Sequence, residues 1–278
     1  MGVTPMLRPA PPCLAASALL AALLAAAPAV APAIADDSRW DYIREQLYGD
    51  RPIAPAGDRL VLETPTRAED AAIVPVSFST RAPQSGPDGI REIRLIIDNN
   101  PAPSAGVFTF PADGAAPVIA TRIRINEYTP VRVVAETNDG RLLMSERFVK
   151  AAGGCSAPAG KDQVAALARL GRMKLNGVEE VRVGEPARLQ LLISHPNNSG
   201  LQFDQVSRTY IPPHYITTLD VTYNGRPVLG LTGDISISED PSIHFTFTPL
   251  EPGVLEVRAV DTKGTTYAGR WTIGASNG

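Results

Sequence analysis

Cys155 lies in a stretch of small residues near the middle of the chain. Residues 151–160 read Ala-Ala-Gly-Gly-Cys-Ser-Ala-Pro-Ala-Gly, with glycines at Gly153, Gly154 and Gly160. No side chain here is large enough to bury an apolar face, and Pro158 opposes both a helix and a central strand. The segment 151–163 is therefore predicted to be a flexible arm with an exposed thiol, although a buried position is common for a free cysteine. An exposed thiol on such an arm suits a covalent handle better than a catalytic nucleophile, which needs a fixed base and oxyanion donors.

The other residues that could do chemistry give weaker signals. His195, His214 and His244 share no short metal spacing, so no metal is predicted, and no glycine-rich phosphate pattern indicates a nucleotide cofactor. His244 alternates with apolar neighbours, which predicts the solvent face of a strand. Arg122 and Arg124 alternate with isoleucines, which predicts both guanidinium groups on one strand face. That face is either simply solvated or provides a positive field for an anionic cargo or a partner.

The first 35 residues have the pattern of a signal peptide. Arg8 precedes an uncharged run rich in Ala and Leu, and Ala33-Ile34-Ala35 has the small-x-small form of a cleavage site. The apolar core is about 15 residues long, shorter than the roughly 20 that a membrane-spanning helix needs. We expect export to the periplasm, cleavage after Ala35, and no membrane attachment afterwards. Of Cys13 and Cys155, only Cys155 would then remain, without a disulfide partner in an oxidising compartment.

Composition excludes some classes of partner. The 278 residues carry 26 Lys and Arg against 29 Asp and Glu, a formal charge of -3, and 44% of them are hydrophobic. No basic block is present, so nucleic acid is not an expected partner.

The elements that must position Cys155 are predominantly strands. A short helix is predicted around Trp40, Ile43 and Leu47. Period-two runs then predict strands, in chain order, at 73–80, 91–98, 117–126, 131–137, 142–150, 171–175, 187–195, 216–223, 228–231, 243–248, 254–260 and 267–273. Hairpin turns are predicted at Asn138-Asp139-Gly140 and Asn224-Gly225. The fold class is therefore all-β, with two immunoglobulin-like β-sandwich domains, 36–150 and 164–278, on either side of a glycine-rich linker.

Several short motifs, taken in order, resemble a known family. In the first half they are Trp40 with Leu47-Tyr48-Gly49, Pro65 to Asp70 before Val74-Pro75-Val76, Asp98 to Pro103 before Phe108, Thr121-Arg122-Ile123-Arg124, and Gly153-Gly154-Cys155. In the second half they are His195-Pro196-Asn197-Asn198-Ser199-Gly200, Ile211-Pro212-Pro213, Asn224-Gly225 and the stretch from Ile235 to Phe247. The chain resembles the SoxYZ sulfur-oxidation carrier, with SoxY and SoxZ fused. The fused form is similar to the SoxYZ-like carriers associated with quinoprotein dehydrogenases.

The resemblance implies a carrier without turnover of its own. Cys155 would be the attachment atom for a sulfur intermediate of thiosulfate or sulfane type, on an arm formed by Gly153, Gly154 and Gly160. The implied partners are periplasmic redox enzymes: a c-type cytochrome or a hydrolase of a sulfur-oxidation pathway, or a quinoprotein dehydrogenase. Because a second domain follows Cys155 here, the arm is tethered at both ends.

Two other functions remain open on the residues alone. The chain could be a non-covalent accessory or assembly protein for an exported quinoprotein dehydrogenase, with Cys155 incidental. A thiol enzyme such as a sulfurtransferase is disfavoured, because no basic residue between Ala151 and Gly160 is available to lower the thiol pKa. The sequence also leaves open the cargo, the docking enzymes, the relative placement of the domains and the oligomeric state.

Overall fold

The computed structural model describes residues 1–2, 38–158 and 167–274. The part from residue 38 onward forms one compact unit. All but the first two residues of the expected leader, and Gly160 of the expected arm, lie outside the described residues. Within the described ranges, no helix is long and apolar enough to cross a membrane.

The strands form two large sheets and a small hairpin. The nine-stranded sheet has the order β1 (Ile53–Pro55), β8 (Leu142–Val149), β7 (Thr129–Thr137), β4 (Ile90–Ile97), β5 (Ser104–Thr109), β14 (Arg226–Gly233), β13 (Ile216–Tyr223), β16 (Gly253–Asp261) and β17 (Thr266–Ile273). The six-stranded sheet has the order β2 (Leu60–Glu63), β3 (Val74–Thr80), β6 (Val118–Ile123), β15 (Ser242–Phe247), β10 (Ala187–Ile193) and β9 (Met173–Asn176). The hairpin consists of β11 (Phe203–Asp204) and β12 (Thr209–Tyr210), and short 3-10 turns lie at Gly57–Arg59 and Val178–Glu180.

The two sheets pack face to face, because alternate strand residues are apolar and point inward. In β3, for example, Val74, Val76 and Phe78 are buried while the residues between them are not. Phe78 packs edge-on against Phe108 of the opposite sheet, with ring centroids 5.2 Å apart. The predicted all-β, immunoglobulin-like class is confirmed.

The helix α1 (Ser38–Tyr48) covers part of the outer face of the larger sheet. The prediction from the apolar spacing is correct: Trp40 and Ile43 are buried, and Leu47 packs beside them. The guanidinium of Arg132 lies over the Trp40 ring, 4.5 Å from its centroid. A cation over an aromatic face is attractive, so this contact fixes the helix against β7.

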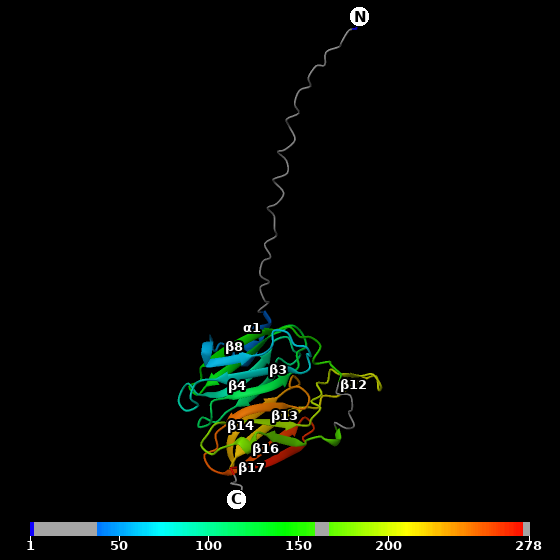
Figure 1. Ribbon diagram of the computed structural model, residues 1–278. Coiled ribbons are helices and arrows are strands. Elements are labelled where there is room, and N and C mark those ends of the chain that lie inside the picture. The colour runs from blue at the N-terminus through cyan, green and yellow to red at the C-terminus, as the bar shows by residue number, and fades with distance from the viewer. Residues whose placement is uncertain (3–37, 159–166, 275–278) are drawn as a thin grey trace. The chain divides into compact units, whose positions relative to one another are not determined.

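The two halves of the chain are joined edge to edge as well as through the linker. In the larger sheet β5 pairs with β14, placing Phe108 opposite Leu231. In the smaller sheet β6 meets β15 at Ala120 and His244. Figure 1 shows the consequence: β8 and β4 of the first half and β14, β13, β16 and β17 of the second succeed one another across one body. Each sheet therefore continues through both halves.

The predicted turns are also present. Gly140, between β7 and β8, has φ +87°, and Asn224 and Gly225, between β13 and β14, have φ +50° and +76°. These left-handed conformations suit Asn and Gly, which explains the turn signals in the sequence.

Candidate functional site

Cys155 is buried rather than exposed. Its side chain has no accessible surface, and it is a free cysteine in a turn after β8. The expectation of a flexible arm with an exposed thiol is therefore wrong for Gly153, Gly154 and Cys155 in this conformation. The small residues could not bury the thiol by themselves, but neighbouring segments of both halves do so.

Three hydrogen bonds hold this segment in place. The amide of Gly153 donates to the carbonyl of Asn126 and that of Gly154 to the carbonyl of Ile125, each at 2.8 Å. The hydroxyl of Ser199 donates to the carbonyl of Cys155 at 2.5 Å. Asn126 and Ile125 belong to the first half of the chain and Ser199 to the second, so Cys155 lies at the junction of the halves.

The two glycines serve different purposes: Gly154 allows close packing, and Gly153 allows a left-handed backbone conformation. A Cβ on Gly154 would lie 2.0 Å from the carbonyl oxygen of Ala71, so no other residue fits in this position. Gly153 has φ +83°, which glycine adopts without steric cost. Both residues are therefore suited to the closed position of the thiol.

Arg124 is the charged residue beside this site. The expected pairing of Arg122 and Arg124 on one solvated strand face is wrong, because β6 ends at Ile123 and Arg124 is only 2% exposed. Its Nη1 donates to the carbonyl of Ile237 at 2.7 Å, and its backbone amide donates to the carbonyl of Ser236. Arg124 thus inserts from the first half into a loop of the second half.

The environment makes the thiol a poor nucleophile in this conformation. Burial raises the pKa of Cys155 to about 11, and the positive charge of Arg124 opposes part of that rise. No basic residue lies between Ala151 and Gly160, so the local sequence predicts none that acts on the thiol. The fold brings Arg124, 31 positions earlier in the chain, close enough for its charge to act on Cys155.

The loop that bears Ser199 begins at a second polar cluster. The Nδ1 atom of His195 accepts a hydrogen bond from the amide of Asn197, and the Asn197 side chain donates to the carbonyl of Ile237, the same oxygen that Arg124 reaches. The residues from His195 to Ser199 therefore connect this cluster to the cysteine site.

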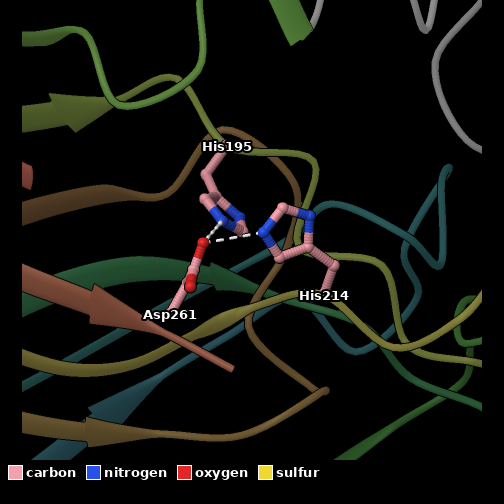
Figure 2. Close-up of side chains that lie close together, drawn as sticks. All are labelled: His195, His214 and Asp261. Carbon is pink, nitrogen blue, oxygen red and sulfur yellow. Dashed lines mark hydrogen bonds and ion pairs between the residues drawn. The ribbon is translucent and has the colours of Figure 1, made fainter. Parts of the chain in front are cut away.

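Figure 2 shows that His195 and His214 point at one oxygen of Asp261. The Nε2 atom of His214 lies 2.7 Å from Oδ2 of Asp261, and that of His195 lies 3.5 Å from it. Tyr267 donates its hydroxyl to the same oxygen at 2.8 Å. Burial, and next the charge of His214, lower the pKa of His195 to about 4, although Asp261 and Asn197 act in the opposite direction. For Asp261, burial raises the pKa, but hydrogen bonds from His214, Tyr267 and backbone amides together hold it below its usual range.

The hydrogen bonds of this cluster do not suit a metal ion. The three ligand atoms are close enough, all within 4.8 Å of one another. A histidine that binds a metal through Nε2 normally donates its Nδ1–H to an acceptor. Here Nδ1 of His195 accepts from Asn197, so the neutral ring carries its proton on Nε2, facing Asp261. The cluster is better described as a buried hydrogen-bonded anchor for its loops.

The remaining predicted residues lie on the outer face of the smaller sheet. His244 lies across from Gln190, as its alternation predicts, and borders a groove of about 670 Å³ with Arg122 and Arg188. Burial, and next the charge of Arg188, lower the pKa of His244. Arg122 donates to the carbonyl of Asp240. These residues are separate from the cysteine site.

Comparison with known families gives the two halves their identity. The family described as sulfur oxidation protein SoxY matches residues 44–155, and the family described as sulphur oxidation protein SoxZ matches residues 174–272. The chain belongs to the SoxYZ family as a fusion of both parts. Residues 44–155 are referred to below as the SoxY half and residues 174–272 as the SoxZ half.

Structural comparison gives weaker likenesses. The sulfur carrier protein SoxY from Chlorobium limicola f thiosulfatophilum is 23% identical, covering 41% of this chain and 92% of that chain, with a TM-score of 0.34. A beta-glycosidase from Bacteroides vulgatus is 12% identical, covering 84% of this chain but 26% of that chain, with a TM-score of 0.23. A search of curated proteins found no match.

The SoxY match ends at Cys155, and the SoxZ half supplies Ser199, which holds it. Cys155, the two glycines and Arg124 are singled out by the sequence, Arg124 for a strand face that it does not occupy, whereas the contributions of Ser199 and Asp261 are not predicted. Asp261 had one local signal: it ends β16 and accepts the amides of Lys263 and Thr265, as an Asp at a tight turn does.

Proposed function

We propose that this chain is a periplasmic covalent carrier that holds a sulfur intermediate on the thiol of Cys155 and presents it to sulfur-oxidising enzymes. The observation that carries the proposal is the coincidence of Cys155 with the end of the SoxY match, in a chain that also has a SoxZ half. Within the described residues, Cys155 is the free cysteine. The signal-peptide pattern in the sequence of residues 1–35 supports the proposed export.

Attachment of thiosulfate to Cys155 is an oxidation, so the carrier needs a separate oxidant. Joining thiosulfate to the thiol forms an S–S bond and gives Cys155–S–S–SO₃⁻, one proton and two electrons. The electrons must pass to an oxidant, for which a c-type cytochrome is the proposed class of partner. A hydrolase would act afterwards on the bound group. The chain itself then needs no turnover.

Loading also requires the closed cysteine segment to open. The thiol has no accessible surface, so a partner enzyme reaches it only after the contacts of Gly153, Gly154 and Ser199 are broken. These hydrogen bonds are few and each contributes about 1 kcal/mol net. The free energy of binding to a partner enzyme is therefore sufficient to break them. We propose that the described conformation is the sequestered state of the carrier.

The burial of Cys155 favours a second candidate function. The Cys155 thiol has no accessible surface, and burial raises its pKa to about 11. A core cysteine with no functional role would have the same properties. In that case the chain would be a non-covalent accessory protein for an exported quinoprotein dehydrogenase.

Replacement of the sulfur atom separates the two candidates. A strain lacking the gene is complemented with the wild-type chain, with Cys155→Ser, or with Ser156→Ala as a matched control at the exposed neighbouring position. The carrier proposal expects the associated oxidation to be lost with Cys155→Ser and retained with Ser156→Ala. Full activity of Cys155→Ser, present at wild-type level, would support the accessory function.

A further inference from the structure

A polar groove of about 670 Å³ lies on the outer face of the smaller sheet, where β6 of the SoxY half meets β15 of the SoxZ half. Short side chains line its middle: Ser77 and Ala120 are partners across β3 and β6, and Ala120 is in turn the partner of His244. The long side chains of Arg122 and Arg188 also border it. Phe, Tyr and Trp are absent from the described residues that line it, which disfavours a sugar or an aromatic ligand.

The positive charge in this groove is not neutralised by ion pairs. Nη2 of Arg122 donates to the carbonyl of Asp240, a neutral acceptor, at 2.8 Å, and Arg188 is exposed. Within the described ranges, neither guanidinium forms an ion pair with a carboxylate. Positive charges gathered at a concave surface attract a soluble anion.

Negative groups lie to one side of this charge. Glu63 is the carboxylate among the described lining residues, and it accepts the hydroxyl of Ser77 at 3.1 Å. Three strand spacings separate Glu63 from His244, which is about 14 Å. The carboxylate of Asp240 accepts the backbone amide of His195 at 3.0 Å. The part of the groove around His244 therefore remains positive.

An oriented hydroxyl lies beside this charge. Nδ2 of Asn176 donates to Oε1 of Gln190 at 3.0 Å, and Nε2 of Gln190 donates to the hydroxyl oxygen of Ser242 at 2.9 Å. Because Ser242 accepts this hydrogen bond, its own O–H can donate to a further group. Ser242 and His244 both line the groove, two positions apart in β15. Arg122 reaches the chain just before Ser242, so a hydroxyl, an imidazole and a guanidinium lie close together.

We propose that this groove is a non-covalent binding site for a free, doubly charged tetrahedral oxyanion, the chemistry that sulfate, thiosulfate and phosphate share. The anion would lie over Ser242 and His244, between the side chains of Arg122 and Arg188. Guanidinium N–H groups bind oxyanions through charge-assisted hydrogen bonds, which are about twice as strong as neutral ones. The site does not use Cys155, so the inference goes beyond the proposed carrier function and does not depend on it.

His244 makes binding at this site dependent on pH. Burial, and next the charge of Arg188, lower the pKa of His244. Arg122, Glu63 and Asp240 are the other charged groups around the ring. A dianion beside the imidazole favours its protonated form, so binding raises the pKa of His244. By linkage, the anion binds more tightly as the pH falls through that pKa.

The test is a titration of the histidine C2 protons by NMR on the purified full chain. The pKa of His244 is measured in sodium sulfate, thiosulfate or phosphate, and in sodium chloride of equal ionic strength. The chloride control is needed because screening of Arg188 by salt also raises this pKa. His244→Asn assigns the signal, and the buried His195 and His214 are internal controls. Sodium succinate tests whether a dianion of another shape binds instead.

We expect a saturable response of His244 to at least one tetrahedral dianion, with its pKa raised by about one pH unit beyond the value in chloride. The anion that acts at the lowest concentration is the preferred ligand. Arg122→Gln and Arg188→Gln should each weaken its binding about tenfold. Arg258→Gln removes the same charge from an exposed position on the other sheet and should bind as the wild type does.

Equal effects of all three tetrahedral anions and chloride would overturn the proposal. Tighter binding of succinate than of any of them would contradict the tetrahedral class. An equal loss in Arg258→Gln would mean that only the net charge of the protein matters. Cys155→Ser should bind the anion as the wild type does, whereas the carrier function is lost with that substitution. The two proposals therefore fail on different results.

Discussion

The hydroxyl of Ser199 donates a 2.5 Å hydrogen bond to the carbonyl of Cys155, so the SoxZ half directly restrains the cysteine of the SoxY half. Ser199 is itself fixed, because its amide donates to the side chain of Gln202 and its hydroxyl accepts the amide of Leu201. The fusion partner is therefore part of the cysteine site and not only a second domain attached to it.

Loss of this hydrogen bond should make the thiol more reactive. Ser199→Ala removes a net contribution of about 1 kcal/mol to the closed state, which corresponds to about fivefold more of the open state. The rate of Cys155 alkylation by iodoacetamide under native conditions should rise about fivefold. Ser207→Ala, in the exposed turn of the β11–β12 hairpin, is the matched control and should leave the rate unchanged. Equal rates in all three proteins would show that Ser199 does not restrain the thiol.

Substitution of Gly154 should open the site more than substitution of Gly153. A Cβ at Gly154 would lie 2.0 Å from the Ala71 carbonyl, whereas one at Gly153 would have open space and face only the strain of φ +83°. Gly154→Ala should therefore accelerate alkylation at least about tenfold, and Gly153→Ala by less, since that strain costs roughly 1 kcal/mol. Faster alkylation of Gly153→Ala than of Gly154→Ala would contradict the close-packing role of Gly154.

Acid should destabilise the fold through His195. Its pKa is about 4 in the folded protein and about 6.5 when unfolded, so protons bind the unfolded state more readily between these values. The stability that neutral His195 contributes is complete above pH 6.5 and is lost as the pH falls toward 4, by up to about 3 kcal/mol.

The measurement is the free energy of unfolding in urea at pH 7, 6, 5 and 4. His195→Asn keeps an acceptor for the Asn197 amide but does not titrate, so its stability should fall less steeply over this range. Asp261, also in the cluster, contributes below pH 4, because its pKa is held beneath the usual value. Identical slopes for His195→Asn and the wild type would rule out the assigned role of His195.

The two halves should unfold together. Both sheets continue across the halves through β5–β14 and β6–β15, and one core of buried residues includes members of both. Calorimetry of the full chain should show a single transition whose calorimetric and van't Hoff enthalpies agree. Gly230→Val, which places a side chain where a Cβ lies 2.4 Å from Thr109 Oγ1, should lower the midpoint of that single transition. Two separate transitions in the wild type would mean that the halves are independent.

Most of the strands could be predicted from sequence because their residues alternate. The runs that became β3, β10 and β16 place apolar residues at every second position, which is what a sandwich strand requires. β5, with the sequence Ser-Ala-Gly-Val-Phe-Thr, was missed because its small residues give no such pattern. It is the strand that joins the larger sheet across the halves, so its absence also hid that junction.

The cysteine site could be predicted only in part. Cys155 and the glycines stand out by residue type, but their burial depends on contacts with Ala71, Ile125 and Ser199, far away in the sequence. The composition of residues 151–160 does not reveal which distant residues pack against them. A buried loop and a mobile arm can therefore have the same local sequence. For the same reason the alternation around Arg124 predicts a strand face shared with Arg122, whereas the side chain is buried beyond the end of β6.

The most direct test of the central claim is the intact mass of the protein purified from its native compartment without reductant, before and after treatment with a thiol reductant. The carrier account predicts added mass of sulfur, sulfite or thiosulfate on Cys155 while the pathway is active, lost on reduction and absent from Cys155→Ser. A protein with only a free thiol at Cys155 under those conditions would contradict it.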